Sequence, residues 1–299
     1  MASMPSRLAL VAVVLVAAGC VGPAPAPRDD IVASFYPVQF LAERIAGDDL
    51  AVGVLVSAGV EPHEYDLRPS DVARLGAARL VLLHGADLEG FASEVATATA
   101  KRGVPVATVT EGIDLRKAIE EGEEVDDPHV WLDPVLFAEE AKNALAAIEA
   151  ADPANATAHR ARAATLAADL ATLADAYEAG LAMCKKRAII TTHAAFGYVA
   201  ARYNFTEHSV SGLEPEAEPS AEAVRAASDL ARRENITVIF FETLVSPKVA
   251  QVIANEIGGE ARVLNPIEGL TDEEAARGED YFSIMRQNLA ALRHAMECA

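Results

Sequence analysis

Three of the seven histidines stand in segments where a side chain could bind a metal ion. His63 lies in EPHEYDLRPSD, His129 in DPHVWLDP and His193 in TTHAAFGY, each in a loop beside a predicted strand or helix. Asp272, in NPIEGLTDEE, offers a carboxylate from a fourth loop. Three neutral imidazoles and one carboxylate form a four-coordinate donor set that suits Zn2+. We therefore expect these four residues to be metal ligands.

The four candidate ligands are far apart along the chain, unlike the ligands of a zinc finger or of an HExxH helix. Such a site can assemble only after folding, at an interface, with two ligands from each half of the chain. Glu61 and Glu64 flank His63, and we expect them to orient it. Trp131, close to His129, is expected to line the cleft or to belong to the ordinary core.

The body of the chain alternates β-rich runs with amphipathic helices, which predicts parallel sheets covered by helices, an α/β fold. This pattern occurs twice. IVASFYPVQFLAERIAG from Ile31 matches AIITTHAAFGYVAARYN from Ala188, and GVEPHEYDLRPSDVARL from Gly59 matches GLEPEAEPSAEAVRAAS from Gly212. We predict two similar lobes at residues 31–151 and 185–299. Ligands of such sheets bind at the carboxyl ends of the strands.

One long helix is predicted between the two lobes, at residues 152–184. Asp152-Pro153 supplies a capping side chain and a proline at the first helical position, and the segment that follows is rich in Ala and Leu. A helix of some 30 residues is about 45 Å long, the span of a whole domain. Such a rigid link allows only small opening motions. We expect His159 on this helix to be exposed on the surface.

The N-terminal segment predicts export. One basic residue is followed by a short apolar run that ends at Gly19-Cys20, as in bacterial lipoprotein signals. We predict a signal peptide at residues 1–19, a lipidated Cys20 and an extended tether at 20–30, with plain secretion as the alternative. An oxidising compartment would permit a disulfide between Cys184 and Cys298, although two free thiols stay open.

The formal net charge of -20 argues against a nucleic-acid partner, because an acidic surface repels phosphates. The interval before His129, EGIDLRKAIEEGEEVDD, is acidic and contains no histidine. We expect a solvated mobile loop there, with weak gathering of zinc as the alternative.

Five of these segments together resemble the zinc and manganese solute-binding proteins of bacterial ABC importers: EPHEYDLRPSDV, DPHVWLDP, THAAFGY, GLEPEAEPS and FFETLVSPKVA. The resemblance covers nearly the whole mature chain. It implies a C-clamp of two four-stranded lobes joined by a long helix, with His63, His129 and His193 as ligands and Asp272 offered as the fourth. It also implies delivery of Zn2+ to an ABC permease, without catalysis. We expect a monomer, and loading by a zinc chaperone stays open.

Other functions remain as alternatives. Manganese members of that family place a carboxylate where His193 stands, so three nitrogens favour zinc over a manganese-binding homologue. Zinc hydrolases also use three histidines, with one position open for water, and Glu61 or Glu64 could then act as a base. A surface adhesin stabilised by zinc is a third class, which would unfold without its metal.

Overall fold

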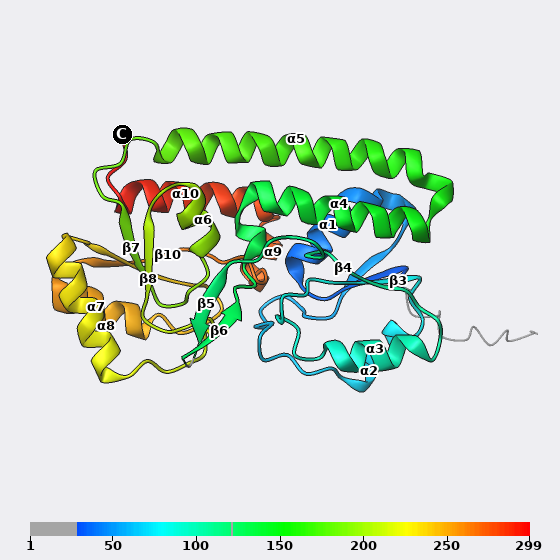
Figure 1. Cartoon of the computed structure of the whole chain (residues 1–299), viewed down its shortest axis with the longest axis horizontal. Helices are drawn as coiled ribbons and strands as arrows, with labels where there is room; N and C mark the ends of the chain where they lie inside the picture. Colours follow the sequence, from blue (N-terminus) through cyan, green and yellow to red (C-terminus); the bar gives the residue numbers. More distant parts are fainter. Residues whose placement is uncertain (1–28, 121) are drawn as a thin grey trace, which may run out of the picture.

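Two parallel β-sheets form the centre of the molecule in the computed structural model, which describes residues 29–299 except residue 121 (Figure 1). The expected signal peptide, Cys20 and nearly all of the expected tether lie outside the described residues. Within the described part, no helix has both the length and the apolar character needed to cross a membrane.

The first sheet has the strand order β2-β1-β3-β4, and all neighbours are parallel. Its central strands β1 and β3 consist wholly of buried residues, as expected for a sheet covered on both faces. The strands are β1 (Ile31–Ala33), β2 (Val52–Val54), β3 (Leu80–Leu83) and β4 (Val106–Thr108). The connections contain α1 (Tyr36–Ala46), η1 (Gly47–Asp49), α2 (Pro69–Leu75) and α3 (Ala92–Ala100).

The second sheet has the order β10-β9-β7-β8 and is also parallel. The strands of each lobe can be numbered in chain order from first to fourth. Read across the sheet, both lobes then show the same arrangement: second, first, third, fourth. The expectation of two similar α/β lobes is therefore confirmed. The elements are β7 (Ala188–Thr191), α6 (Gly197–Arg202), β8 (Thr206–Ser209), α7 (Ala221–Glu234), β9 (Val238–Phe241), α8 (Lys248–Ile257) and β10 (Glu260–Val263).

A long helix joins the lobes, as the sequence predicts. It is α5 (Ala156–Leu181), and a short 3-10 turn, η3 (Pro153–Asn155), precedes it. It packs on α1 and α4 (Pro134–Ala151) of the first lobe and on α10 (Tyr281–Ala295) of the second. Figure 1 shows it running along one side of both lobes.

His159 is buried in α5, so the expectation of an exposed histidine is wrong. Its ring nitrogens lie 3.2 Å from the backbone oxygen of Ile45 and 3.2 Å from Oδ2 of Asp152. The buried residues of α5 recur at helical spacing and include His159, Ala163, Leu166, Leu170 and Leu173. His159 therefore belongs to the stripe that faces the first lobe.

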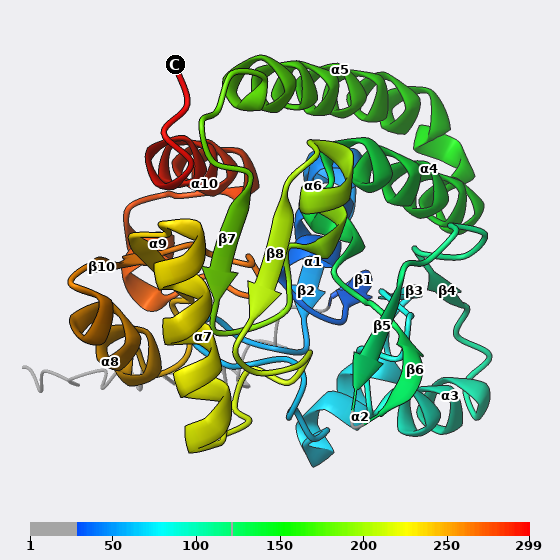
Figure 2. The same cartoon turned by 60° about the vertical axis from the view of Figure 1, so that its left-hand side comes forward.

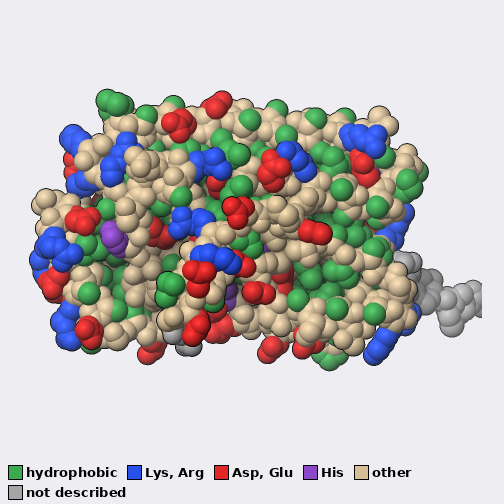
Figure 3. Space-filling model, viewed as in Figure 1, with side chains coloured by type: hydrophobic (Ala, Val, Ile, Leu, Met, Phe, Trp, Pro, Cys, Tyr) green, Lys and Arg blue, Asp and Glu red, His purple; other side chains and the backbone are tan. Residues whose placement is uncertain are grey.

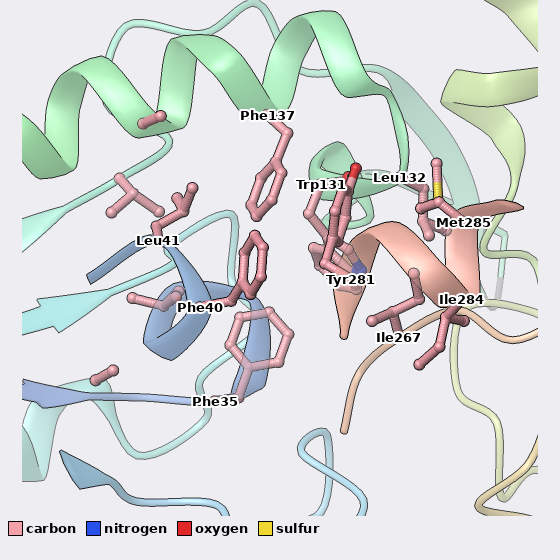
Figure 4. Close-up of a cluster of buried hydrophobic side chains, with 14 of the residues drawn as sticks. Phe35, Phe40, Leu41, Trp131, Leu132, Phe137, Ile267, Tyr281, Ile284 and Met285 are labelled. Carbon is pink, nitrogen blue, oxygen red and sulfur yellow. The ribbon is translucent and has the colours of Figure 1, made fainter. Parts of the chain in front are cut away.

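The two lobes share one hydrophobic core at their junction. Figure 4 shows Phe40 of α1, Phe137 of α4 and Tyr281 of α10 side by side. Trp131, in the short helix η2 (Val130–Leu132), packs edge-on against Phe35 with ring centroids 5.0 Å apart. Its indole N–H donates to the oxygen of Pro266 in the second lobe at 2.7 Å. These apolar contacts, together with the paired polar atoms among them, hold the two lobes together.

The acidic interval before His129 forms a β-hairpin, contrary to the expected mobile loop. Strand β5 (Lys117–Glu120) pairs with β6 (Glu123–Asp126), and Gly122 takes the positive φ of 88° in the turn between them. Figures 1 and 2 place this hairpin between the two lobes.

A disulfide between Cys184 and Cys298 ties the chain just after α5 to its C-terminal end. The two cysteines are 114 residues apart in the sequence. The bond therefore encloses the whole second sheet in one covalent loop.

Replacing both Cys184 and Cys298 by serine should lower the free energy of unfolding by about 2–4 kcal/mol, because the unfolded chain regains the freedom of a long loop. Urea unfolding followed by circular dichroism measures this change. A reducing agent should destabilise the original protein and leave the double variant unaffected. Equal stabilities of the two proteins would contradict the expectation.

Candidate metal centre

Four side chains converge between the lobes: His63, His129, His193 and Glu268. Each offers one ligand atom, and these atoms all lie within 4.8 Å of one another. His129, His193 and Glu268 are buried and His63 is partly buried. Two of the residues come from the first half of the chain and two from the second, so neither lobe could form the group alone.

His63 is held by the loop between β2 and α2. The carboxylate of Glu61 accepts the backbone N–H of His63 at 3.1 Å and that of Glu64 at 3.2 Å. Burial raises the pKa of Glu61 to about 7. Through these backbone hydrogen bonds Glu61 shapes the loop of His63, whereas the side chain of Glu64 is exposed. Nε2 of His63 lies 3.5 Å from Oε1 of Glu268.

His129 stands at the start of η2 and is fully buried. Oδ1 of Asp127 accepts from its backbone N–H at 3.1 Å and lies 2.9 Å from Nδ1 of the ring. With the proton on Nδ1, Nε2 is directed at Oε1 of Glu268, 3.1 Å away. Burial lowers the pKa of His129, but the hydrogen bonds to Asp127 and Glu268 outweigh it and raise that pKa to about 10.

His193 follows β7, at the carboxyl end of a central strand. Its Nε2 lies 2.9 Å from the oxygen of Leu213. Since a carbonyl can only accept, Nε2 donates to it. Nδ1 lies 3.2 Å from Oε2 of Glu242 and 3.9 Å from Oε1 of Glu268. Burial lowers the pKa of His193, but the charges of Glu268 and Glu242 raise it above its usual value.

Glu268 brings the negative charge to the centre of the group. Burial raises the pKa of this carboxyl, but the imidazoles, led by His193, outweigh it and hold that pKa well below its usual range. Its Oε2 and Nε2 of His63 are buried and have no hydrogen-bond partner among the residues that the structure describes. Buried polar atoms are normally paired, and a cation between these donors would pair them.

The structure places Glu268, instead of the expected Asp272, in the fourth position. The chain turns inward at Ile267, which has a φ of 60° and donates its N–H to Oδ1 of Asn265 at 2.7 Å. Asp272 is the exposed first residue of α9 (Asp272–Ala276), where Thr271 caps the helix. A carboxylate in a first turn is stabilised by the helix dipole, so its surface position needs no metal.

The other histidines of the sequence lie outside the group. His84 is buried and its Nε2 lies 2.7 Å from the oxygen of Pro128, next to His129. His294 is exposed and pairs with Glu260, and His208 lies on β8. Asp127 lies beside His129 in the sequence as well as in the structure, whereas Glu242, the partner of His193, was not singled out although it stands in a segment that carries the resemblance.

The arrangement offers three imidazole nitrogens and one carboxylate, without a thiolate or a separate nucleophile in the group. Such donors suit a borderline divalent cation in four-coordinate geometry. Two similar α/β lobes, joined by a long helix and meeting at a cation site, define the class of metal-binding solute-binding proteins.

Comparison with known proteins gives the same class. The family model of the zinc-uptake complex component A, periplasmic (ZnuA), matches residues 31–295. The high-affinity zinc uptake system protein ZnuA of Bacillus subtilis is 34% identical over 277 residues, 89% of this chain and 87% of that protein. The chain belongs to this zinc-uptake family.

Two further relatives are similar in sequence or structure. The zinc-binding protein AdcA of Streptococcus pyogenes is 34% identical over 283 residues, which are 88% of this chain and 55% of AdcA. The chain thus spans about half the length of that relative. The Zn(II)-bound ZnuA-like domain of Streptococcus pneumoniae AdcA superposes with a TM-score of 0.80 at 33% identity, covering 91% of this chain and all of that domain.

The metal-free protein should become less stable as the pH rises above neutrality. The pKa of His129 is about 10 in the folded protein, against 6.5 as the ordinary value. The stability contributed by its protonated form is therefore present below about pH 6.5 and is lost towards pH 10. Urea unfolding in the presence of a chelator, at several pH values, measures the slope. His129→Gln should flatten it, and an unchanged slope in that variant would refute the assignment.

Proposed function

We propose that this chain captures Zn2+ outside the cytoplasm, between its two lobes, and delivers it to an ABC-type permease in the membrane. The observation that carries the proposal is the convergence of three imidazoles and one carboxylate, from both lobes, on a common point. Membership of the zinc-uptake family supports the same role. A site shared between lobes can release its ion when the lobes shift slightly, which a transport protein requires.

The proposed ligand atoms are Nε2 of His63, Nε2 of His129, Nδ1 of His193 and a carboxylate oxygen of Glu268. The ring orientations support this choice, because Asp127 and Leu213 accept from the other ring nitrogens of His129 and His193, while Nδ1 of His193 lies 3.9 Å from Oε1 of Glu268. We propose Glu268 in place of Asp272, since it lies 3.1 Å from His129 whereas Asp272 is exposed.

Zinc is proposed over manganese because of the donor types. Manganese prefers oxygen ligands, and three of the four donors are imidazole nitrogens. A hydrolytic role is not supported, since the family is a binding component of zinc uptake.

We also propose that Cys20 is lipidated and anchors the protein to the membrane, after removal of residues 1–19. The small-small-Cys sequence at the end of the apolar run supports this. Lobes at residues 31–151 and 185–299, a linker at 152–184, a monomeric state and loading by a zinc chaperone remain parts of the proposal.

The purified protein should carry one zinc ion per chain, and Glu268→Ala should weaken zinc binding more than about 100-fold, because a ligand is lost. Calorimetry or competition with a chelator of known affinity measures the change. His193→Ala should have an effect of the same order.

Asp272→Ala is the matched control, since it removes the same charge from a nearby exposed position. Its zinc affinity should stay within about twofold of the original, as for most changes at exposed positions. Loss of zinc in Asp272→Ala and retention in Glu268→Ala would reverse the assignment of the fourth ligand.

A further inference from the structure

The β5–β6 hairpin belongs to the first half of the chain but is fastened to the second lobe. Figures 1 and 2 show it between the lobes, and Figure 3 shows acidic and basic side chains gathered at the middle of that face. Its second strand, β6, leads directly into Asp127 and His129. The hairpin is therefore continuous with one ligand loop while it touches the lobe that carries His193.

The base of the hairpin is bound to α6 of the second lobe. The hydroxyl of Tyr198 accepts the backbone N–H of Arg116 at 2.9 Å and donates to the oxygen of Asp127 at 2.7 Å. The guanidinium of Arg116 lies 3.6 Å from the carboxylate of Asp127. Both ends of the hairpin thus meet at Tyr198, next to the residue that orients His129.

The tip of the hairpin is bound to the loop that holds His193. Oε2 of Glu120 accepts the backbone N–H of Leu213 at 2.8 Å. The oxygen of the same Leu213 accepts the Nε2 proton of His193, and the oxygen of Gly212 accepts the N–H of Ala194. Leu213 is therefore held on one side by Glu120 and on the other by the ligand histidine.

Gly212 has a specific reason to be glycine at this contact. A Cβ atom there would lie 2.1 Å and 2.4 Å from the two carboxylate oxygens of Glu120. These oxygens are the far end of a flexible side chain, so an alanine would push the carboxylate away instead of disrupting the backbone. The absence of a side chain at Gly212 therefore leaves room for the carboxylate of Glu120.

We propose that the hairpin is a clasp on the zinc site and that Glu120 is a positioning residue for His193, an inference that rests on the proposed function. Glu120 holds Leu213, whose carbonyl accepts the Nε2 proton of His193 and so orients the ring with Nδ1 towards Glu268. A charged acceptor makes this hydrogen bond stronger than a neutral one. Separation of His129 and His193 during zinc release requires the Glu120–Leu213 contact to break.

The test compares zinc dissociation rates of the full chain and its variants, measured by transfer of zinc to an excess of a chromogenic chelator. Glu120→Ala should release zinc about tenfold faster, the lower end of the effect of residues that orient metal ligands. Gly212→Ala should do the same, because it displaces the Glu120 carboxylate. Combined with Glu120→Ala it should add little, since the carboxylate is already absent.

Two further variants separate hydrogen bonding from charge and from folding. Glu120→Gln loses the charge but keeps an acceptor for the N–H of Leu213. It should therefore release zinc nearly as slowly as the original protein. Glu124→Ala removes an exposed carboxylate from the same hairpin and should release zinc at the original rate. Thermal unfolding of the zinc-free variants should remain cooperative, with a midpoint lowered only as far as the loss of one hydrogen bond explains.

The clasp is overturned if Glu120→Ala releases zinc at the original rate while the original protein binds one zinc ion, and the proposed function then stands. It is also overturned if Glu124→Ala or Glu120→Gln accelerates release as much as Glu120→Ala, because charge alone would then explain the effect. If the original protein binds no zinc, both the clasp and the proposed function fail.

Discussion

The buried carboxylate of Glu268 is the group on which the arrangement between the lobes depends. A carboxylate removed from water needs compensating charge or hydrogen bonds, and here three imidazole nitrogens lie 3.1 to 3.9 Å from Oε1. In the metal-free protein these imidazole nitrogens share protons with Glu268. A divalent cation would bind to the same nitrogens and to the same carboxylate. Zinc and protons therefore compete for one cluster, and the surrounding residues decide which nitrogen is available to each.

The geometry of the site depends on how the two lobes are positioned relative to each other. That relation is held by a shared aromatic core, by α5 along both lobes and by buried hydrogen bonds such as that from Trp131 to Pro266. The last bond joins the loops of His129 and Glu268 directly, one from each lobe. With so much apolar surface common to both lobes, wide opening would expose the core, so the movement that frees an ion must be small.

Each of the three proposed ligand histidines is oriented by a different kind of partner. Asp127 accepts the proton of His129, the carbonyl of Leu213 accepts that of His193, and Glu61 shapes the loop of His63 through backbone N–H groups. The acidic hairpin connects two of these arrangements, because its base adjoins Asp127 and its tip holds Leu213. This hairpin contains no histidine, but it contacts the residues that orient His129 and His193.

The sequence alone predicted the duplicated α/β lobes, the helix that joins them and three candidate histidines in loops, because repeats, periodicity and residue type are local properties. It predicted Asp272 where the structure brings Glu268 to the histidines, since the direction of each carboxylate depends on the turn at Ile267 and on burial beneath the other lobe. The sequence analysis also did not predict that His159 is buried or that β5 and β6, at 117–126, form a hairpin. Those outcomes rest on contacts between residues distant in the chain, which exist only once the lobes have packed together.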